Sequence, residues 1–291
     1  MRIVLFGYGE MGCTALEFLI AQKETVAAVI THRDDPNEKR WFRSLAGMAG
    51  SQGLPVGFSG DQDLVSDLRP ELILSFYYRD MIPMRVLAPA SKGALNLHGS
   101  LLPRLRGRAP LNWALVDGEE RCGVTLHHMV KEPDAGDIVA QRGWEIGPRD
   151  TAKDLFDRAV AETKILLREI WPKIRDGSAP RHPQDASKAT YRGRRTPEDG
   201  RIDWTVPAWR IDGLVRAVTD PFPGAFTAIG PDRLMIWAGT PVPGRGTPGT
   251  LIENNVVATG DGAYRIERWS LAERPAVAPP LRAGTRLGDT P

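Results

Sequence analysis

Short apolar runs that resemble buried strands alternate with segments of helical periodicity in the N-terminal part of this chain. The runs predict strands at residues 2–6, 25–32, 54–57 and 71–78. Helices are predicted between them, at the residues that follow Gly12 and at 38–52 and 64–68. Strands that alternate with helices predict a Rossmann-like α/β fold, a doubly wound and mostly parallel sheet with both faces covered.

A long amphipathic segment separates this pattern from a different one. Residues 151–176 predict a helix with Asp150 or Thr151 as its N-cap. Polar stretches with Pro and Gly at 176–187 and 193–200 predict a linker. From about residue 202, short apolar runs between Gly and Pro turns predict a small β-barrel-like (OB-like) domain or a sandwich, with a loosely held tail at its end. We therefore expect three regions, an N-terminal domain at 1–190, a linker at 191–203 and a C-terminal domain at 204–291.

Composition argues against several classes of protein. The 291 residues, 42% hydrophobic and 25% charged, have the make-up of a globular protein. A net charge of +2 gives no indication of a nucleic-acid partner. No apolar run approaches the roughly 18 residues that cross a membrane, and the N-terminal run predicts a core strand and not a signal peptide. Cys13 and Cys122 fit neither a metal site nor a disulfide framework, which favours a cytoplasmic location.

The turn Gly7-Tyr8-Gly9-Glu10-Met11-Gly12 has the spacing of a dinucleotide-binding motif between a strand and a helix. Taken alone it suggests an NAD-dependent dehydrogenase. However, Glu10 places a carboxylate where a phosphate would sit, and the acid expected at the end of the second strand is replaced by Thr31 or His32. A tight strand-to-helix turn favours the same glycines, so we interpret this motif as structural.

The densest group of polar residues in an apolar setting lies in ALNLHGSLLPRLRGRAPLNWAL, residues 94–115. Residues two apart in a strand share a face, so Asn96 and His98 are predicted to project together while Leu95 and Leu97 pack behind them. The carboxyl end of such a strand is where open α/β sheets build their clefts. An amide and an imidazole at this place indicate a candidate catalytic pair.

A second polar group follows the predicted strand at 123–130. Asp134 lies in a Pro-Asp-Ala-Gly turn and Asp137 is its rival, because both could reach His98 and both could simply stabilise the turn. His127 and His128 are adjacent and point to opposite faces of the strand, so at least one is expected to be structural and no metal site is expected.

The motif N-L-H-G-S-L-L-P-x-x-R-G-R-A-P at 96–110, with the later D-A-G, resembles the 10-formyltetrahydrofolate-dependent formyltransferases. That family includes glycinamide ribonucleotide transformylase, methionyl-tRNA formyltransferase and amino-sugar formyltransferases. The likeness is closest to the formyltransferase half of the bifunctional UDP-4-amino-4-deoxy-L-arabinose formyltransferase and UDP-glucuronate dehydrogenase, through the segments 31–39, 74–82, 107–119 and 193–200. That enzyme continues into an NAD-binding dehydrogenase and this chain ends at Pro291, so we expect another polypeptide to carry out any oxidative decarboxylation.

The resemblance implies that Asn96 stabilises the oxyanion, His98 transfers protons and Asp134 raises the pKa of the imidazole. Physical chemistry supports these roles, because the attack of an amine on a formamide builds charge on oxygen and moves two protons. The resemblance also places 10-formyltetrahydrofolate, the formyl donor, beside the following residues: Asp80, Met81, Ile82, Arg108, Val130, Lys131, Glu132, Pro133 and Asp134. No metal is implied.

Three functions remain open at the level of sequence. The first is formylation of a nucleotide-linked 4-amino sugar, most simply UDP-4-amino-4-deoxy-L-arabinose as in lipid A modification. The second is formylation of methionyl-tRNA, which should require a basic surface, although no Lys follows Lys188. The third is a protein of another class, an NAD dehydrogenase or a noncatalytic folate-binding module. We favour the first function. Its expected partners are folate and a nucleotide sugar, and neither nucleic acid nor a membrane is expected. The sequence leaves open whether the chain forms a homo-oligomer.

Four arginines gather at the predicted linker and could meet a pyrophosphate: Arg192, Arg194, Arg195 and Arg201. The alternative interpretation is a solvated linker.

Overall fold

The structure of the protein is a computed structural model that describes residues 1–36 and 40–288. The described chain forms two compact units, each built from segments that are separate in the sequence. The first unit comprises residues 1–107, 122–144 and 157–192, and the second comprises 108–121, 145–156 and the residues from 193 onward. The expected domain ranges of 1–190, 191–203 and 204–291 stay a prediction.

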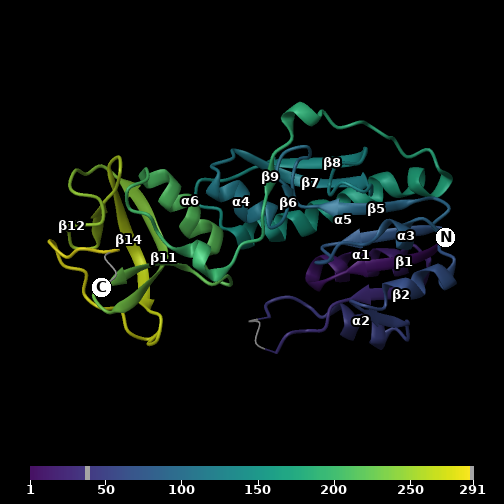
Figure 1. The fold of residues 1–291 in the computed structure, drawn as a ribbon, viewed down its shortest axis with the longest axis horizontal. Coiled ribbons are helices and arrows are strands. Elements are labelled where there is room, and N and C mark those ends of the chain that lie inside the picture. Colours follow the sequence, from purple (N-terminus) through teal and green to yellow (C-terminus); the bar gives the residue numbers. More distant parts are fainter. Residues whose placement is uncertain (37–39, 289–291) are drawn as a thin grey trace. The chain divides into compact units, whose positions relative to one another are not determined.

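The first unit is built on a seven-stranded sheet (Figure 1). Its strands are β1 (Arg2–Gly7), β2 (Thr25–Thr31), β3 (Val56–Phe58), β4 (Leu72–Phe76), β5 (Ala94–His98), β7 (Arg121–His128) and β8 (Ile138–Glu145). They lie in the order β3-β2-β1-β4-β5-β7-β8. The pairs from β3 through β5 are parallel, whereas β5 and β7 are antiparallel. This confirms the predicted mostly parallel α/β sheet.

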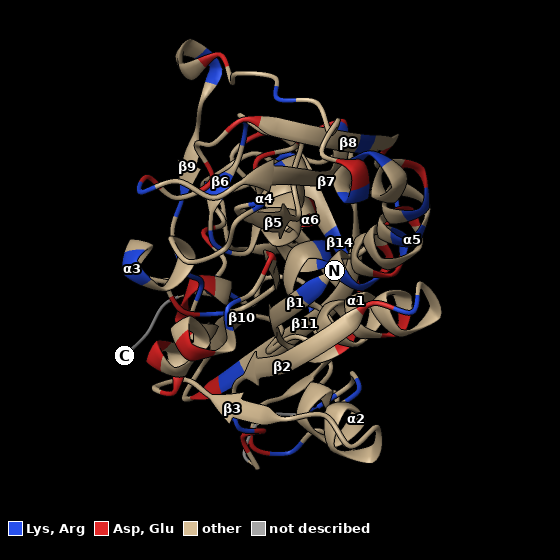
Figure 2. Ribbon diagram, turned by 90° about the vertical axis from the view of Figure 1, so that its right-hand side faces the viewer, with Lys and Arg blue, Asp and Glu red and all other residues tan. Residues whose placement is uncertain are grey.

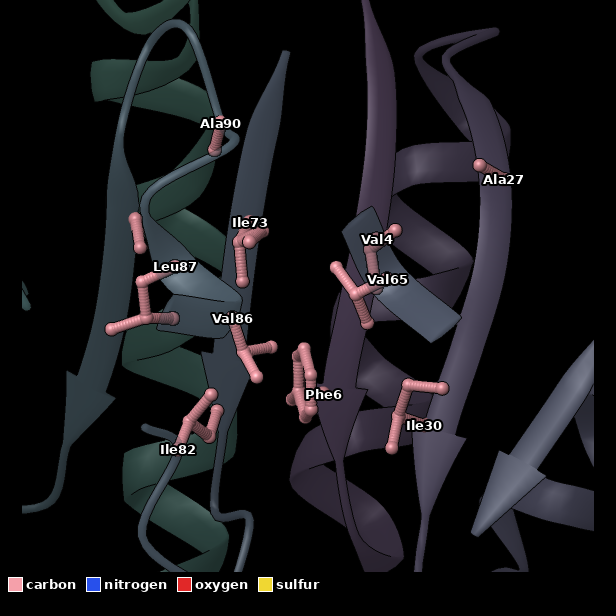
Figure 3. Packing of buried hydrophobic residues seen from close by; sticks show 11 residues of the cluster. Val4, Phe6, Ala27, Ile30, Val65, Ile73, Ile82, Val86, Leu87 and Ala90 are labelled. Carbon is pink, nitrogen blue, oxygen red and sulfur yellow. The ribbon is translucent and has the colours of Figure 1, made fainter. Parts of the chain in front are cut away.

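Helices cover both faces of this sheet. On one face, residues of four strands form an apolar cluster with side chains from η1 (Gln62–Leu68), α3 (Met84–Leu87) and their neighbours (Figure 3). The cluster consists of Val4, Phe6, Ala27, Ile30, Val65, Ile73, Ile82, Val86, Leu87, Ala90 and Ala94. The intervening residues Ile3 and Leu5 are fully buried toward the other face, where α1 (Gly9–Ala21) lies against β1, β2 and β4. Phe18 of α1 meets Trp171 of α5 (Ala152–Asp176) edge to face, with ring centroids 5.3 Å apart.

Two predicted helices differ in the structure. The helix expected at 38–52 is only α2 (Leu45–Ser51), because the Ser44 side chain accepts a hydrogen bond from Gly47 N and caps the helix there. Its expected beginning, from Glu38 to Lys39, lies outside the described residues. The segment predicted as helix at 64–68 belongs to the 3₁₀ helix η1, which ends at Arg69 in a left-handed conformation with φ of 45°.

The predicted helix at 151–176 is confirmed as α5, and Thr151 is its N-cap. The Thr151 side chain accepts a hydrogen bond from Asp154 N at 3.3 Å, while Asp154 accepts one from Thr151 N at 2.9 Å. This reciprocal pair is a capping box. None of the helices in the described part of the chain is long and apolar enough to span a membrane.

The second unit contains an antiparallel sheet, as expected. Its strands β10 (Ala225–Ile229), β11 (Asp232–Val242), β12 (Leu251–Glu253), β13 (Val256–Ala258) and β14 (Ala263–Leu271) lie in the order β10-β11-β14-β13-β12. The helices α4 (Pro110–Val116) and α6 (Ala208–Val218) and the short η3 (Pro197–Gly200) complete it.

The tail that the sequence suggested was loosely held is bound to this sheet as far as Gly288. Leu281 and Leu287 are buried, Leu251 N donates to Thr285 O at 2.8 Å and Gly288 N donates to Ala228 O at 3.0 Å. The prediction was wrong here because hydrogen bonds to the backbone of distant strands leave no periodic signal in the tail itself.

Candidate functional site

The site is built around the carboxyl end of β5. Leu95 and Leu97 are buried on one face of this strand, with exposures of 2% and 1%. Asn96 and His98 project from the other face toward the turn that contains Asp134. The structure therefore brings together the two residues that strand alternation predicted to share a face.

Asp134 connects the pair. Its Oδ1 lies 3.5 Å from His98 Nδ1 and accepts a hydrogen bond from Asn96 Nδ2 at 3.4 Å, while its Oδ2 accepts one from Gly107 N at 2.9 Å. Asp137, its rival, instead accepts a hydrogen bond from Arg181 Nε at 3.2 Å. The geometry thus distinguishes the two carboxylates.

His127 also belongs to this cluster, although the sequence did not distinguish it from His128 or give it a role in the site. It lies opposite Asn96 in the register of β5 and β7, and its Nε2 is 3.1 Å from Asn96 Nδ2 and 3.4 Å from Asp134 Oδ1. Its Nδ1 lies 2.9 Å from the carbonyl oxygen of His128, which can only accept, so Nδ1 carries a proton. In the neutral ring Nε2 is then an acceptor for the Asn96 amide. A prediction of which strand residue pairs with Asn96 would have revealed this contact.

His98 has one ring nitrogen committed to the backbone. Its Nε2 lies 2.8 Å from the carbonyl oxygen of Leu105, so Nε2 must donate. In the neutral ring Nδ1 is therefore unprotonated and faces Asp134. Nδ1 is the atom at which this imidazole gains or loses a proton.

Burial and charge act in opposite directions at this pair. Burial lowers the pKa of His98, and the negative charge of Asp134 only partly offsets it, so the net pKa lies below the ordinary value. The contribution of Asp134 has the predicted sign but does not dominate. Burial alone would raise the pKa of Asp134, but His98, His127 and the Gly107 amide lower it to about 2. Near neutral pH the site therefore holds a neutral His98 imidazole beside the Asp134 carboxylate.

The residues expected to contact folate lie mostly at the surface. Met81 and Val130 are exposed apolar side chains, at 64% and 42%, and are accessible to an apolar ligand. The Ile82 side chain packs in the core cluster, so any contact it makes with a ligand must come from its backbone. The remaining exposed members are Asp80, Lys131, Glu132 and Pro133. Arg108 is also exposed, and it belongs to the second unit.

The glycine-rich turn after β1 is explained by packing. A Cβ at Gly9, where φ is 58°, would lie 2.9 Å from the Phe42 ring, and one at Gly12 would lie 2.7 Å from a Leu45 methyl group. The Arg43 guanidinium, 2.5 Å from the Glu10 carboxylate, holds the pKa of Glu10 below its usual range. These contacts support the structural interpretation of the motif.

Burial argues against a chemical role for the two cysteines. Cys13 and Cys122 are buried and are not joined in a disulfide, and burial raises the pKa of Cys13 to about 12. Within residues 1–36 and 40–288, no group of His, Cys, Asp or Glu could hold a metal ion.

Two of the four linker arginines pack on aromatic rings inside the second unit. The Arg195 guanidinium carbon lies 4.6 Å from the centre of the Trp113 ring, and that of Arg201 lies 5.2 Å from the centre of the Phe226 ring. These two therefore do not fit the interpretation of a fully solvated linker.

Comparisons with known proteins agree over nearly the whole chain. The formyl transferase family model matches residues 1–170, and the model of the formyl transferase C-terminal domain matches residues 194–280.

Three solved structures share the fold at low sequence identity. The N-formyltransferase from Helicobacter canadensis, in complex with folinic acid and dTDP-3-aminofucose, is 19% identical with a TM-score of 0.75, over 92% of this chain and 99% of that one. WlaRD, a sugar 3N-formyl transferase solved in the presence of dTDP and 5-N-formyl-THF, is 18% identical with a TM-score of 0.72, over 91% and 96%. Methionyl-tRNA formyltransferase from Clostridium thermocellum is 20% identical with a TM-score of 0.60, over 82% and 93%.

Proposed function

Because this chain belongs to the formyl transferase family, we propose that it transfers a formyl group from 10-formyltetrahydrofolate to the primary amine of a nucleotide-linked 4-amino sugar. The observation that carries the proposal is the triangle of Asn96, His98 and Asp134, in which one carboxylate oxygen lies within 3.5 Å of both the amide and the imidazole. The chain is a formyltransferase, and the residues of this triangle are its proposed catalytic set.

Asn96 stabilises the developing negative charge. When the amine nitrogen attacks the formyl carbon, the formyl oxygen becomes anionic, and an oriented amide donor lowers the energy of that state by about 3 kcal/mol. Of the two hydrogen bonds that Asn96 Nδ2 donates, the one to Asp134 is the longer, at 3.4 Å against 3.1 Å to His127. A substrate oxygen would replace that weaker bond.

His98 moves the proton between the two nitrogens. The bond from carbon to the amine nitrogen forms while the bond from carbon to the folate nitrogen breaks, so the amine must lose a proton and the folate nitrogen must gain one. The neutral His98 accepts the first at Nδ1, the nitrogen left free by the bond from Nε2 to Leu105, and then donates it. The Asp134 carboxylate, 3.5 Å away, stabilises the imidazolium in between.

Two observations support 10-formyltetrahydrofolate as the formyl donor, namely the ligands of similar structures and the exposed apolar side chains of this chain. The two sugar formyltransferase structures contain folinic acid or 5-N-formyl-THF. We propose that the folate ring lies against the exposed Met81 and Val130 and that the donor site in the first unit consists of residues 80–82 and 130–134.

Two observations support a nucleotide-linked amino sugar as the formyl acceptor, namely the ligands of similar structures and the mixed charge of helix α5. The N-formyltransferase from Helicobacter canadensis was solved with the nucleotide-linked amino sugar dTDP-3-aminofucose, and WlaRD, a sugar 3N-formyl transferase, was solved with dTDP. The longest helix, α5, carries acidic and basic residues side by side instead of a basic stripe (Figure 2), which argues against a tRNA substrate. Within the sugars, we propose UDP-4-amino-4-deoxy-L-arabinose, from the sequence likeness of residues 107–119 and 193–200 to its formyltransferase.

One assay tests donor and acceptor together. The protein is incubated with 10-formyltetrahydrofolate and a panel of UDP- and dTDP-linked amino sugars, with charged initiator tRNA in parallel, and tetrahydrofolate release is followed. We expect turnover with a 4-amino sugar and none with tRNA. Turnover with tRNA alone, lost steeply as salt rises, would establish the methionyl-tRNA activity instead.

A further inference from the structure

Each ring nitrogen of His98 faces a residue that has a left-handed backbone. Nε2 donates to the Leu105 carbonyl and Nδ1 faces the Asp134 carboxylate, and both Leu105 and Asp134 have a φ of 55°. Residues with a side chain adopt this conformation at a cost and keep it only where their surroundings hold it. What holds these two turns therefore decides how His98 is presented.

Both turns are held by one segment, residues 182–192, which we name the strap. The sequence predicted parts of it as linker. Instead, it is tied to the first unit at both ends. His182 and Ile138 exchange backbone hydrogen bonds of 2.8 and 2.9 Å, and β9 (Tyr191–Arg192) pairs in parallel with β6 (Arg106–Gly107).

Thr190 of the strap fixes the turn at Leu105. Its Oγ1 accepts a hydrogen bond from Leu105 N at 2.8 Å, its carbonyl accepts one from Arg106 N at 2.8 Å, and its own N donates to Pro103 O at 3.3 Å. Three hydrogen bonds to residues 103–106 leave the Leu105 carbonyl little freedom to turn away from His98.

Gln184 of the strap fixes the turn at Asp134. Its Nε2 donates to the carbonyl oxygens of Asp134 and Gly136 at 2.8 and 2.7 Å. Its Oε1 accepts from Nη2 of Arg106 at 2.7 Å, and that buried arginine, 4% exposed, also donates from Nη1 to the Tyr191 hydroxyl at 2.7 Å. The two turns and the strap thus share one partly buried hydrogen-bond network, with the buried Arg106 at its centre.

We propose that Gln184 and Thr190 are positioning residues for His98, which hold the two strained turns that present a carboxylate to Nδ1 and a carbonyl to Nε2. Neither residue is placed against the reacting atoms. The proposal rests on the proposed role of His98 in formyl transfer, and its effect is on the geometry and titration of the imidazole.

The test uses His98 itself as the reporter, so it does not depend on which amine is the substrate. The titration and tautomer of His98 are followed by ¹⁵N NMR in three proteins. These are the wild type, Thr190→Val, which replaces the hydroxyl with a methyl group, and Thr190→Ser, which keeps the hydroxyl. The charged and titratable groups that face His98, Asp134, His127 and Arg106, are unchanged in all three. Ser187→Ala is the matched control, because the Ser187 hydroxyl bonds to Asp185 within the strap.

We expect Thr190→Val to shift the His98 titration to lower pH and to weaken the preference for the proton on Nε2, because the Leu105 carbonyl no longer holds it. Thr190→Ser and Ser187→Ala should match the wild type.

With an accepted amine, Thr190→Val and Gln184→Leu should lower kcat at least about tenfold and change KM by less than about twofold, because misplaced groups reduce the rate more than the binding of substrate. An unchanged His98 titration and tautomer in Thr190→Val, or an equal change in Ser187→Ala, would overturn the proposal. A lack of formyl transfer in the wild type would instead contradict the proposed function.

Discussion

Asn96 and His127 lie directly opposite each other on the antiparallel strands β5 and β7, with Asn96 Nδ2 3.1 Å from His127 Nε2. Cross-strand partners share a face of the sheet, so a histidine from β7 orients the amide that projects from β5. An amide that stabilises an oxyanion must be held in place before the charge appears. His127 is therefore expected to affect the reaction through Asn96.

Replacing His127 should lower the rate without preventing folding. In His127→Ala the Asn96 amide loses one of its two partners, and we expect kcat to fall at least about tenfold, because a loosely held group contributes less to transition-state stabilisation. The matched control is His128→Ala, on the same strand but the opposite face, which should keep kcat within about twofold. Steady-state kinetics and thermal unfolding of both variants check this. Equal losses of kcat in the two would mean that the effect comes from β7 as a whole.

Replacing His98 should have a larger effect on turnover. His98→Ala removes the group proposed to carry the proton between the two nitrogens, and the expected loss in kcat is at least about a hundredfold, the usual scale of acid–base catalysis. The circular dichroism spectrum should remain that of the wild type. Turnover close to the wild type at a saturating amine concentration would exclude His98 from this role.

Nicotinamide cofactors should not bind at the turn from Gly7 to Gly12. Phe42 and Leu45 occupy the positions against which its glycines pack, and the Glu10 carboxylate is paired with Arg43. Isothermal titration calorimetry with NAD and NADP should detect no binding in the micromolar range. A micromolar dissociation constant for either cofactor would revive the dehydrogenase interpretation.

The sequence predicted those features of the site that depend on local periodicity. Alternation along one strand was enough to place Asn96 and His98 on one face, and the motif around them led to the family. The pairing of His127 with Asn96 depends on the register between two strands about thirty positions apart, which periodicity within either strand does not encode. The same limit applies to the Leu105 carbonyl, whose contact with His98 depends on a left-handed turn held by Thr190.

The overall fold was predictable for a similar reason. The prediction was wrong where tertiary contacts determine the conformation. Buried strands of a parallel sheet are continuous apolar runs and are easily recognised. By contrast, the helix at 38–52 was predicted too long because its start is set by the Ser44 cap. Parts of the strap were predicted as linker because its polar residues bond to distant loops. In both cases the local sequence does not reveal the hydrogen-bond partner that decides the structure.

The last prediction concerns Asp134 and Asp137. If the neutral imidazole accepts the proton of the amine, kcat/KM should rise with pH as His98 loses its proton. Since burial lowers the pKa of His98, the midpoint should lie below the ordinary value of about 6.5. Asp134→Asn removes the charge that favours the imidazolium, so the midpoint should move to still lower pH and the plateau should fall at least about tenfold.

Asp137→Asn provides the matched control for this pair. Asp137 bonds to Arg181 and is not placed against His98, so both the midpoint and the plateau should stay close to those of the wild type. The measurements are pH–rate profiles of the two variants, with the His98 titration followed by NMR. Equal losses in both variants would indicate a general disturbance of the turn, whereas a loss confined to Asp137→Asn would mean that Asp137 is the catalytic carboxylate.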